Sequence, residues 1–131
     1  MFISWYKIYK KDKTDDREKI DIPMAVLVNQ NSASASEIFA SAVKDSGKGI
    51  VIGTQTFGKG VVQYVRPIKG HGAISIVSSQ YFTSSGVVIQ DNGIEPNIVV
   101  ELSDELKNDS YIARDKDLQL QEALKYIKEQ L

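Results

Sequence analysis

Ser34 and Lys59 have the residue types and the surroundings that nucleophilic catalysis requires. Ser34 is the middle serine of "SASAS", where an apolar run gives way to a helical pattern. A serine hydroxyl is a weak nucleophile and needs a base to remove its proton. Lys59, in "TFGKG", is our candidate base, because burial can lower the pKa of a lysine to about 7–8. The alternative interpretation of "TFGKG" is a surface turn in which the two glycines have only a structural role.

Ser34 also has a purely structural interpretation. With Glu37 it forms the pattern of a capping box, in which each residue hydrogen-bonds the backbone of the other at a helix start. Capping does not require the small neighbours Ala33 and Ala35, which leave room for another chain to approach the hydroxyl. The positive end of the helix dipole would also stabilise an oxyanion. Both interpretations stay open at this point.

Other residues with chemical potential are given structural roles. His71 lies between two glycines and is interpreted as an exposed loop residue rather than a base. We interpret Asp45 as a polar residue of the last helical turn and Glu37 as the partner of the cap. Arg66 and the stretch "YFTSSG" are candidates for the lining of a substrate cleft, with no defined role.

The segment from Gly53 to Lys59 matches the G-x-x-x-x-G-K spacing of a phosphate-binding loop. The next residue is Gly60, so the hydroxyl that would hold Mg²⁺ is missing. The following "VVQYV" is typical of a strand, whereas a phosphate loop opens a helix. We therefore interpret this segment as something other than a nucleotide site.

The elements around these residues predict an α/β fold. "IPMAVLVN" is a short apolar run typical of a buried strand, a helix is expected over residues 34–46, and "GIVIG" is a second strand. This order favours a βαβ unit with parallel strands. "VVQYVRPI" and "GAISIVSSQYFT" predict an antiparallel hairpin, and "GVVIQDNGIEPNIVVEL" adds short strands. In the tail, one helical face is expected to carry Leu120, Ala123, Leu124, Ile127 and Leu131.

Composition excludes several classes of protein. The net charge of -1 argues against a nucleic-acid binder. The absence of cysteine excludes disulfides and thiolate metal sites, and a single histidine excludes a histidine-rich zinc site. No apolar run reaches the length of a membrane-spanning helix. The start "MFISWYKIYKKDK" is too short and too charged for a secretory signal, so no targeting segment is expected in this chain.

The blocks "VLVNQNSASASEIFASAVKDSG", "IVIGTQTFGKGVVQ" and "YFTSSGVVIQDNGIEPNIVV" resemble the carboxy-terminal processing peptidases, also called tail-specific proteases. That family consists of serine endopeptidases with a serine–lysine dyad. The resemblance places the nucleophile on Ser34, the general base on Lys59 and a lysine-orienting glutamine on Gln63. It gives the backbone N–H of Ala35 as one oxyanion donor. It also implies a spiral core of ββα units of the crotonase and Clp-protease kind.

The resemblance divides the chain into three parts. Residues 1–22 correspond to a variable strand and charged loop, residues 23–102 to the catalytic core, and residues 103–131 to a C-terminal helical segment. The PDZ domain and the Gly-Gly turn of the oxyanion hole, which family members usually carry upstream, are absent from these 131 residues. We therefore interpret the chain as a partial domain that is inactive or very slow in isolation.

The resemblance further implies protein or peptide substrates recognised through their C-terminal tails. It implies an extracytoplasmic location, in the periplasm or cell envelope, and no cofactor or metal. An open sheet edge would favour homo-oligomers. The alternative from a different class is a non-catalytic interaction or oligomerisation module in which Ser34 is only a helix cap.

Overall fold

The computed structural model describes residues 22–107, 109 and 111–131. The strand expected near the N-terminus and the charged loop after it lie outside these residues. The described elements are, in order, β1 (Ala25–Val28), α1 (Ala35–Ser46), β2 (Ile50–Gly53), β3 (Val61–Ile68), β4 (Gly72–Gln80), β5 (Ile98–Val99) and α2 (Leu118–Glu129). Neither helix is long and apolar enough to cross a membrane within this described part of the chain.

The predicted βαβ unit is present. β1 and β2 pair in parallel, from Ala25 opposite Ile50 to Val28 opposite Gly53, and β5 adds a third parallel strand beyond β2. Helix α1 connects β1 to β2. It ends at Gly47, whose φ of 66° is the left-handed conformation that favours glycine at this position.

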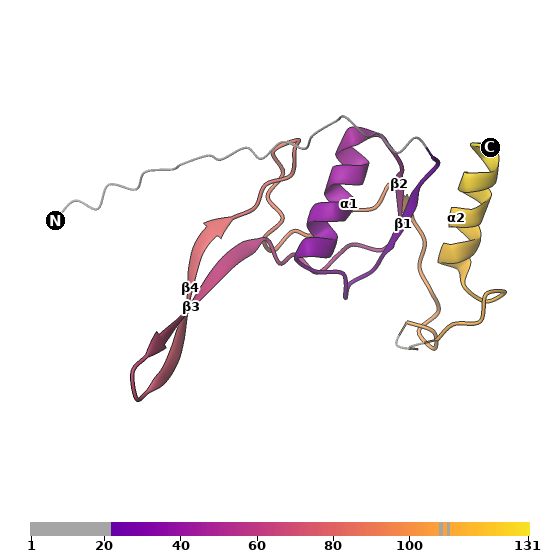
Figure 1. Ribbon diagram of the computed structural model, residues 1–131. Helices are drawn as coiled ribbons and strands as arrows, with labels where there is room; N and C mark the ends of the chain where they lie inside the picture. The colour runs from indigo at the N-terminus through magenta and orange to yellow at the C-terminus, as the bar shows by residue number, and fades with distance from the viewer. Residues whose placement is uncertain (1–21, 108, 110) are drawn as a thin grey trace.

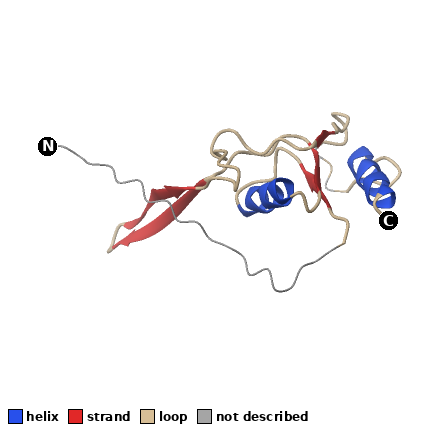
Figure 2. Cartoon of the chain, turned by 90° about the horizontal axis from the view of Figure 1, so that it is seen from above, coloured by secondary structure: helices blue, strands red, loops and turns tan. Residues whose placement is uncertain are grey.

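Two helices cover the two faces of this small sheet. Both α1 and α2 contact β1 and β2, and the sheet lies between them in Figures 1 and 2. Parallel strands covered on both faces are expected to be apolar throughout, and β2 has that character. The buried apolar side chains are those of Val28, Ala40, Val43, Val51, Ile52, Ile89, Ile94 and Ala123.

The second sheet is the predicted hairpin of β3 and β4. Its strands pair antiparallel from Val61 opposite Gln80 to Ile68 opposite Gly72, with a bulge between Val62 and Gln63. The hairpin extends away from the helices and the parallel sheet (Figure 1), and every residue of β4 is exposed. Fewer short strands follow than we expected, because only β5 and an isolated bridge between Phe82 and Val88 form there.

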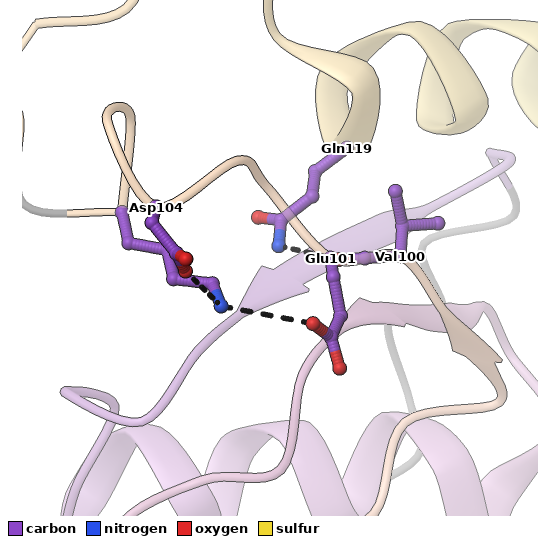
Figure 3. A network of polar contacts seen from close by, with 5 residues as sticks. Val100, Glu101, Asp104 and Gln119 are labelled. Carbon is purple, nitrogen blue, oxygen red and sulfur yellow. Dashed lines mark hydrogen bonds and ion pairs between the residues drawn. The ribbon is translucent and has the colours of Figure 1, made fainter.

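Helix α2 is anchored at its first turn. The Asp117 carboxylate accepts a hydrogen bond from the Leu120 N–H at 2.9 Å, and the buried Gln119 amide donates to the Val100 carbonyl at 2.8 Å. Figure 3 shows this second contact beside the exposed carboxylate of Glu101. Of the predicted apolar face of α2, Ala123 is buried, and Leu131 is 91% exposed because the helix ends before it. The other three members are half-buried.

Candidate active site

Ser34 has an unusual backbone conformation for a helix cap. It is the N-cap of α1, with φ of 58° and ψ of −116°. N-cap residues normally adopt the β region, and a non-glycine residue with positive φ costs on the order of 1–3 kcal/mol. A sharp, strained turn between a strand and a helix is also what exposes the nucleophilic serine of α/β-hydrolases. A capping role alone therefore does not account for the conformation of Ser34.

The capping box predicted for Ser34 and Glu37 is present. Its well-formed half is the hydrogen bond from the Ser34 N–H to Glu37 Oε2, at 2.8 Å. The half that involves the Ser34 hydroxyl is looser and does not have the geometry of a cap hydrogen bond. The hydroxyl is thus not committed to the helix backbone.

Glu37 has more partners than a cap requires. Its side chain is completely buried, at 0% exposure. Besides Ser34, it accepts hydrogen bonds from the Thr56 hydroxyl at 2.6 Å, the Gly58 N–H at 2.7 Å and the Lys59 N–H at 2.8 Å. Burial by itself raises the pKa of the Glu37 carboxyl, but these four hydrogen bonds outweigh it, and the pKa is lowered.

Residues 54–60, which we call the lysine loop, are folded against the serine turn. The Phe57 N–H donates to the Ser32 carbonyl at 2.9 Å, so the two segments are also joined outside Glu37. Gly58 has φ of 91°, and a Cβ there would lie 3.0 Å from the Gly93 nitrogen. The two glycines beside Lys59 therefore permit the tight fold predicted from the sequence.

A third segment, residues 89–94, supports the lysine loop from its other side. Thr56 pairs with Ile94 through two hydrogen bonds, of 3.2 Å between backbone groups and 2.7 Å from the Ile94 N–H to the Thr56 hydroxyl. The Gly60 N–H donates to Gln90 Oε1 at 3.0 Å. The lysine loop is therefore fixed along both sides.

The structure brings Ser34 and Lys59 together through their backbones, but it does not pair their side chains. The Lys59 side chain is exposed, contrary to the burial expected for a lysine base. Within the described residues, its amine makes no hydrogen bond to the Ser34 hydroxyl or to the Gln63 amide. Catalytic hydrogen bonds are often long before substrate binds. Gln63 lies on β3, just after the bulge, and is exposed.

The Ala35 N–H is available for hydrogen bonding. It is the first N–H of α1, next to Ser34, and it meets no acceptor among the described residues. The following N–H, of Ser36, is already bonded to the Ala33 carbonyl at 3.2 Å. An oxyanion at the start of α1 would therefore find a free donor at Ala35.

Asp45 has partners that the sequence did not predict. From the last turn of α1 its carboxylate accepts the Ser84 hydroxyl at 2.7 Å and the Ser85 N–H at 2.9 Å. Burial raises the pKa of this carboxyl, but hydrogen bonds from Ser84, Ser85 and Thr83 outweigh it, and the pKa is lowered. Asp45 thus fastens the "YFTSSG" segment to α1. His71 and Arg66 lie exposed on the hairpin, as predicted for His71.

The bridging role of Glu37 and the contribution of Thr56 were not predicted from the sequence. Thr56 lies 19 residues from Glu37 along the chain, so no local pattern could associate them. The available signal was an acidic residue among the small and apolar residues at the start of α1.

Comparison with known proteins agrees with the resemblance found in the sequence. The model of peptidase family S41 matches residues 4–100. A carboxy-terminal-processing protease from Bartonella bacilliformis is 48% identical over 69% of this chain and 20% of its own length. A probable CtpA-like serine protease from Staphylococcus haemolyticus is 34% identical over 92% of this chain and 26% of its own.

Solved structures support the same α/β fold. A photosystem II D1 C-terminal processing protease is 39% identical, covers 60% of this chain and superposes with a TM-score of 0.57, although only 20% of its own chain is matched. An S41 protease structure from Bacteroides fragilis, 18% identical with a TM-score of 0.61, supports the fold alone. This chain spans about a fifth to a quarter of the curated relatives it matches. It belongs to peptidase family S41.

Proposed function

We propose that this chain carries the nucleophile and the base of a carboxy-terminal processing serine endopeptidase. The observation that supports this best is the shared contact of Ser34 and Lys59: both backbone N–H groups donate to Glu37 Oε2. The positive φ of Ser34 and the free N–H of Ala35 give further support. Membership of peptidase family S41 supplies the reaction class.

The proposed reaction uses three side chains and one backbone N–H group of this chain. Neutral Lys59 removes the proton of the Ser34 hydroxyl, and Oγ bonds to the peptide carbonyl carbon while the Ala35 N–H donates to the oxyanion. The C–N bond then breaks, and Lys59 gives its proton to the leaving amine. In the second half, Lys59 deprotonates water and the hydroxide bonds to the acyl carbon. The bond from that carbon to Ser34 Oγ then breaks, the carboxylic acid product leaves, and Lys59 returns the proton to Ser34 Oγ. Gln63 orients the lysine amine.

Lys59 must lose contact with water to work as a base near neutral pH. Its side chain is exposed in this chain, so we propose that bound substrate or another part of the catalytic domain covers it. The 131-residue chain by itself is therefore expected to be inactive or very slow. Robust proteolysis by these residues alone would contradict this part of the proposal.

We propose proteins recognised by their C-terminal tails as substrates, and the cell envelope or periplasm as the location. The substrate class is supported by the names of the family and of the relatives. The location is supported only by the resemblance of the sequence motifs to the tail-specific proteases. No cofactor enters the proposed steps.

The test is cleavage of an unstructured polypeptide with an apolar C-terminus by the full-length protein. Ser34→Ala and Lys59→Ala should each reduce turnover to background, because either change removes the nucleophile or its base. Ser36→Ala and Lys69→Ala are matched controls, which remove a serine two residues away and an exposed lysine on the hairpin. Near-parental turnover by Lys59→Ala would overturn the dyad.

The hairpin favours a second candidate function, that of a non-catalytic interaction or oligomerisation module. Tyr64 and Val65 are 66% and 71% exposed, and Ile74, Ile76 and Val77 are exposed beside them. A two-stranded hairpin is marginally stable in water unless something packs on it. Sedimentation of the chain with and without Ile76→Lys tests this function. A dimer that Ile76→Lys dissociates, together with unchanged cleavage by Ser34→Ala, would favour the module.

A further inference from the structure

We infer that Glu37 is a positioning residue that holds the serine turn and the lysine loop in register for proteolysis. This inference rests on the proposed function, because it concerns the residues assigned there. Glu37 touches neither the proposed nucleophile nor the proposed base through their reacting atoms. Its contacts are instead with the backbone on which Ser34 and Lys59 are carried.

The two carboxylate oxygens of Glu37 accept hydrogen bonds from different pairs of donors. Oε1 accepts from the Thr56 hydroxyl and the Gly58 N–H, at 2.6 and 2.7 Å. Oε2 accepts from the Ser34 and Lys59 N–H groups, at 2.8 Å each. One oxygen therefore fixes the path of the lysine loop, and the other joins that loop to the serine turn.

These contacts exclude a role for Glu37 in proton transfer. A carboxylate offers about four lone-pair sites, and four donors occupy them here. The side chain is completely buried and makes no ion pair with another described residue. Its negative charge is thus balanced by N–H and O–H dipoles that are fixed in place.

The position of Glu37 explains why its charge matters more than its bulk. Ser34 has a positive φ that its own local sequence does not favour, and the bond from its N–H to Glu37 holds that conformation. Lys59 follows Gly58, which has a φ of 91°. Because glycine adopts many backbone conformations about equally well, the local sequence does little to fix the conformation of the loop. Without the carboxylate, neither backbone retains the partner that orients it toward the other.

Glu37→Gln is the sharpest variant, because it keeps the size and removes one acceptor. Either orientation of the amide places an NH₂ group against two donors, since each oxygen of Glu37 serves two. Glu101→Gln is the matched control. It makes the same change of charge at an exposed glutamate whose contact is an ion pair with Lys107 at 3.7 Å, near α2 (Figure 3).

Amide hydrogen exchange of the whole 131-residue chain measures the positioning without requiring activity. We expect Glu37→Gln to speed exchange at Ser34, Gly58 and Lys59 by about tenfold or more. The amides that pair β1 with β2 should accelerate by less than these three, and all sites in Glu101→Gln should keep the parental rates. Unchanged exchange at the three amides would overturn the inference. So would an equal loss of protection throughout the sheet, which indicates general destabilisation.

The kinetic measurement uses the full-length protein on the same unstructured polypeptide. Misplacing a reacting group by about 1 Å can cost about 100-fold in rate. We expect Glu37→Gln to lower kcat by about 10- to 100-fold with KM within about threefold of parental. If Ser34→Ala abolishes cleavage but Glu37→Gln keeps kcat within twofold, the inference fails and the proposed function stands. If Ser34→Ala cleaves normally, the proposed function fails, and the exchange result alone decides whether Glu37 joins the two segments.

Discussion

Ser34 and Lys59 donate their backbone N–H groups to the same carboxylate oxygen, Oε2 of Glu37, each at 2.8 Å. Their nitrogens therefore lie within two hydrogen-bond lengths of each other, although 25 positions separate the residues in the printed sequence. This relationship connects the start of α1 to the loop that enters β3. It makes the conformation of each segment depend on the other.

The positive φ of Ser34 predicts an effect of glycine on stability. We expect Ser34→Gly to be more stable than Ser34→Ala by about 1 kcal/mol, because glycine adopts this conformation without the strain of a Cβ. Ser36 provides the matched pair, since it lies in the first turn of α1, where glycine is expected to be the less stable of the two. Urea unfolding of the four variants measures both differences. Equal stability of the Ser34 pair would mean that this backbone is not strained.

The lowered pKa of Glu37 predicts a dependence of stability on pH. The folded-state pKa of Glu37 lies below the ordinary value of 4.5. In acid, the unfolded chain therefore binds more protons at this group than the folded chain does, and stability falls as pH falls. The contribution of Glu37 to the free energy of unfolding is thus complete above about pH 4.5 and is lost as pH falls through the folded-state pKa. We expect Glu37→Gln to reduce the free energy of unfolding at pH 7. We also expect that free energy to fall less steeply between pH 5 and 3 in the variant than in the parental chain.

Urea unfolding at a series of pH values checks that prediction. Glu101→Gln serves as the control, because it removes an exposed carboxylate outside the site. If the free energy of unfolding of Glu37→Gln falls as steeply in acid as that of the parental chain, the pH dependence does not come from Glu37.

The hydrogen bonds between Asp45 and the turn at residues 83–86 predict a local change in stability when the carboxylate is removed. Asp45→Ala removes the acceptor of the Ser84 hydroxyl and the Ser85 N–H. We expect a loss of about 1 kcal/mol, modest because the contact is exposed, and faster amide exchange at Ser85. Asp104→Ala removes a similarly exposed carboxylate that pairs with Lys107 and should leave Ser85 unchanged. If the Ser85 amide exchanges at the parental rate in Asp45→Ala, the proposed role of these hydrogen bonds is wrong.

The close approach at Gly60 predicts a steric effect on the lysine loop. A Cβ at Gly60 would lie 2.8 Å from Ile89 Cβ and would also meet the Gln90 backbone, so a backbone segment would have to move. We expect Gly60→Ala to cost about 2–3 kcal/mol. Gly86→Ala is a useful comparison, because its φ of 87° is strained but no atom lies within 4 Å. Thermal unfolding that ranks Gly60→Ala as the milder change would contradict the packing described here.

Short-range patterns in the sequence were enough to predict the local elements and to propose the residues of the site. The apolar runs, the helical spacing and the stop at Gly47 specified β1, α1 and β2, because hydrophobic periodicity and capping are short-range properties. The motifs around Ser34 and Lys59 were recognisable for the same reason. The last residue, Leu131, was assigned to a helical face in error because spacing does not reveal where a helix frays.

How these residues are held depends on contacts between segments that are distant in the chain. Glu37 reads as an ordinary cap partner in the sequence, and Thr56 as an unremarkable loop residue. Folding removes Glu37 from water, and a buried carboxylate must then find donors wherever the chain brings them. It finds them at Thr56, Gly58 and Lys59, which no local pattern relates to α1. The exposure of Lys59 is likewise a property of packing, because it depends on which segments cover the amine.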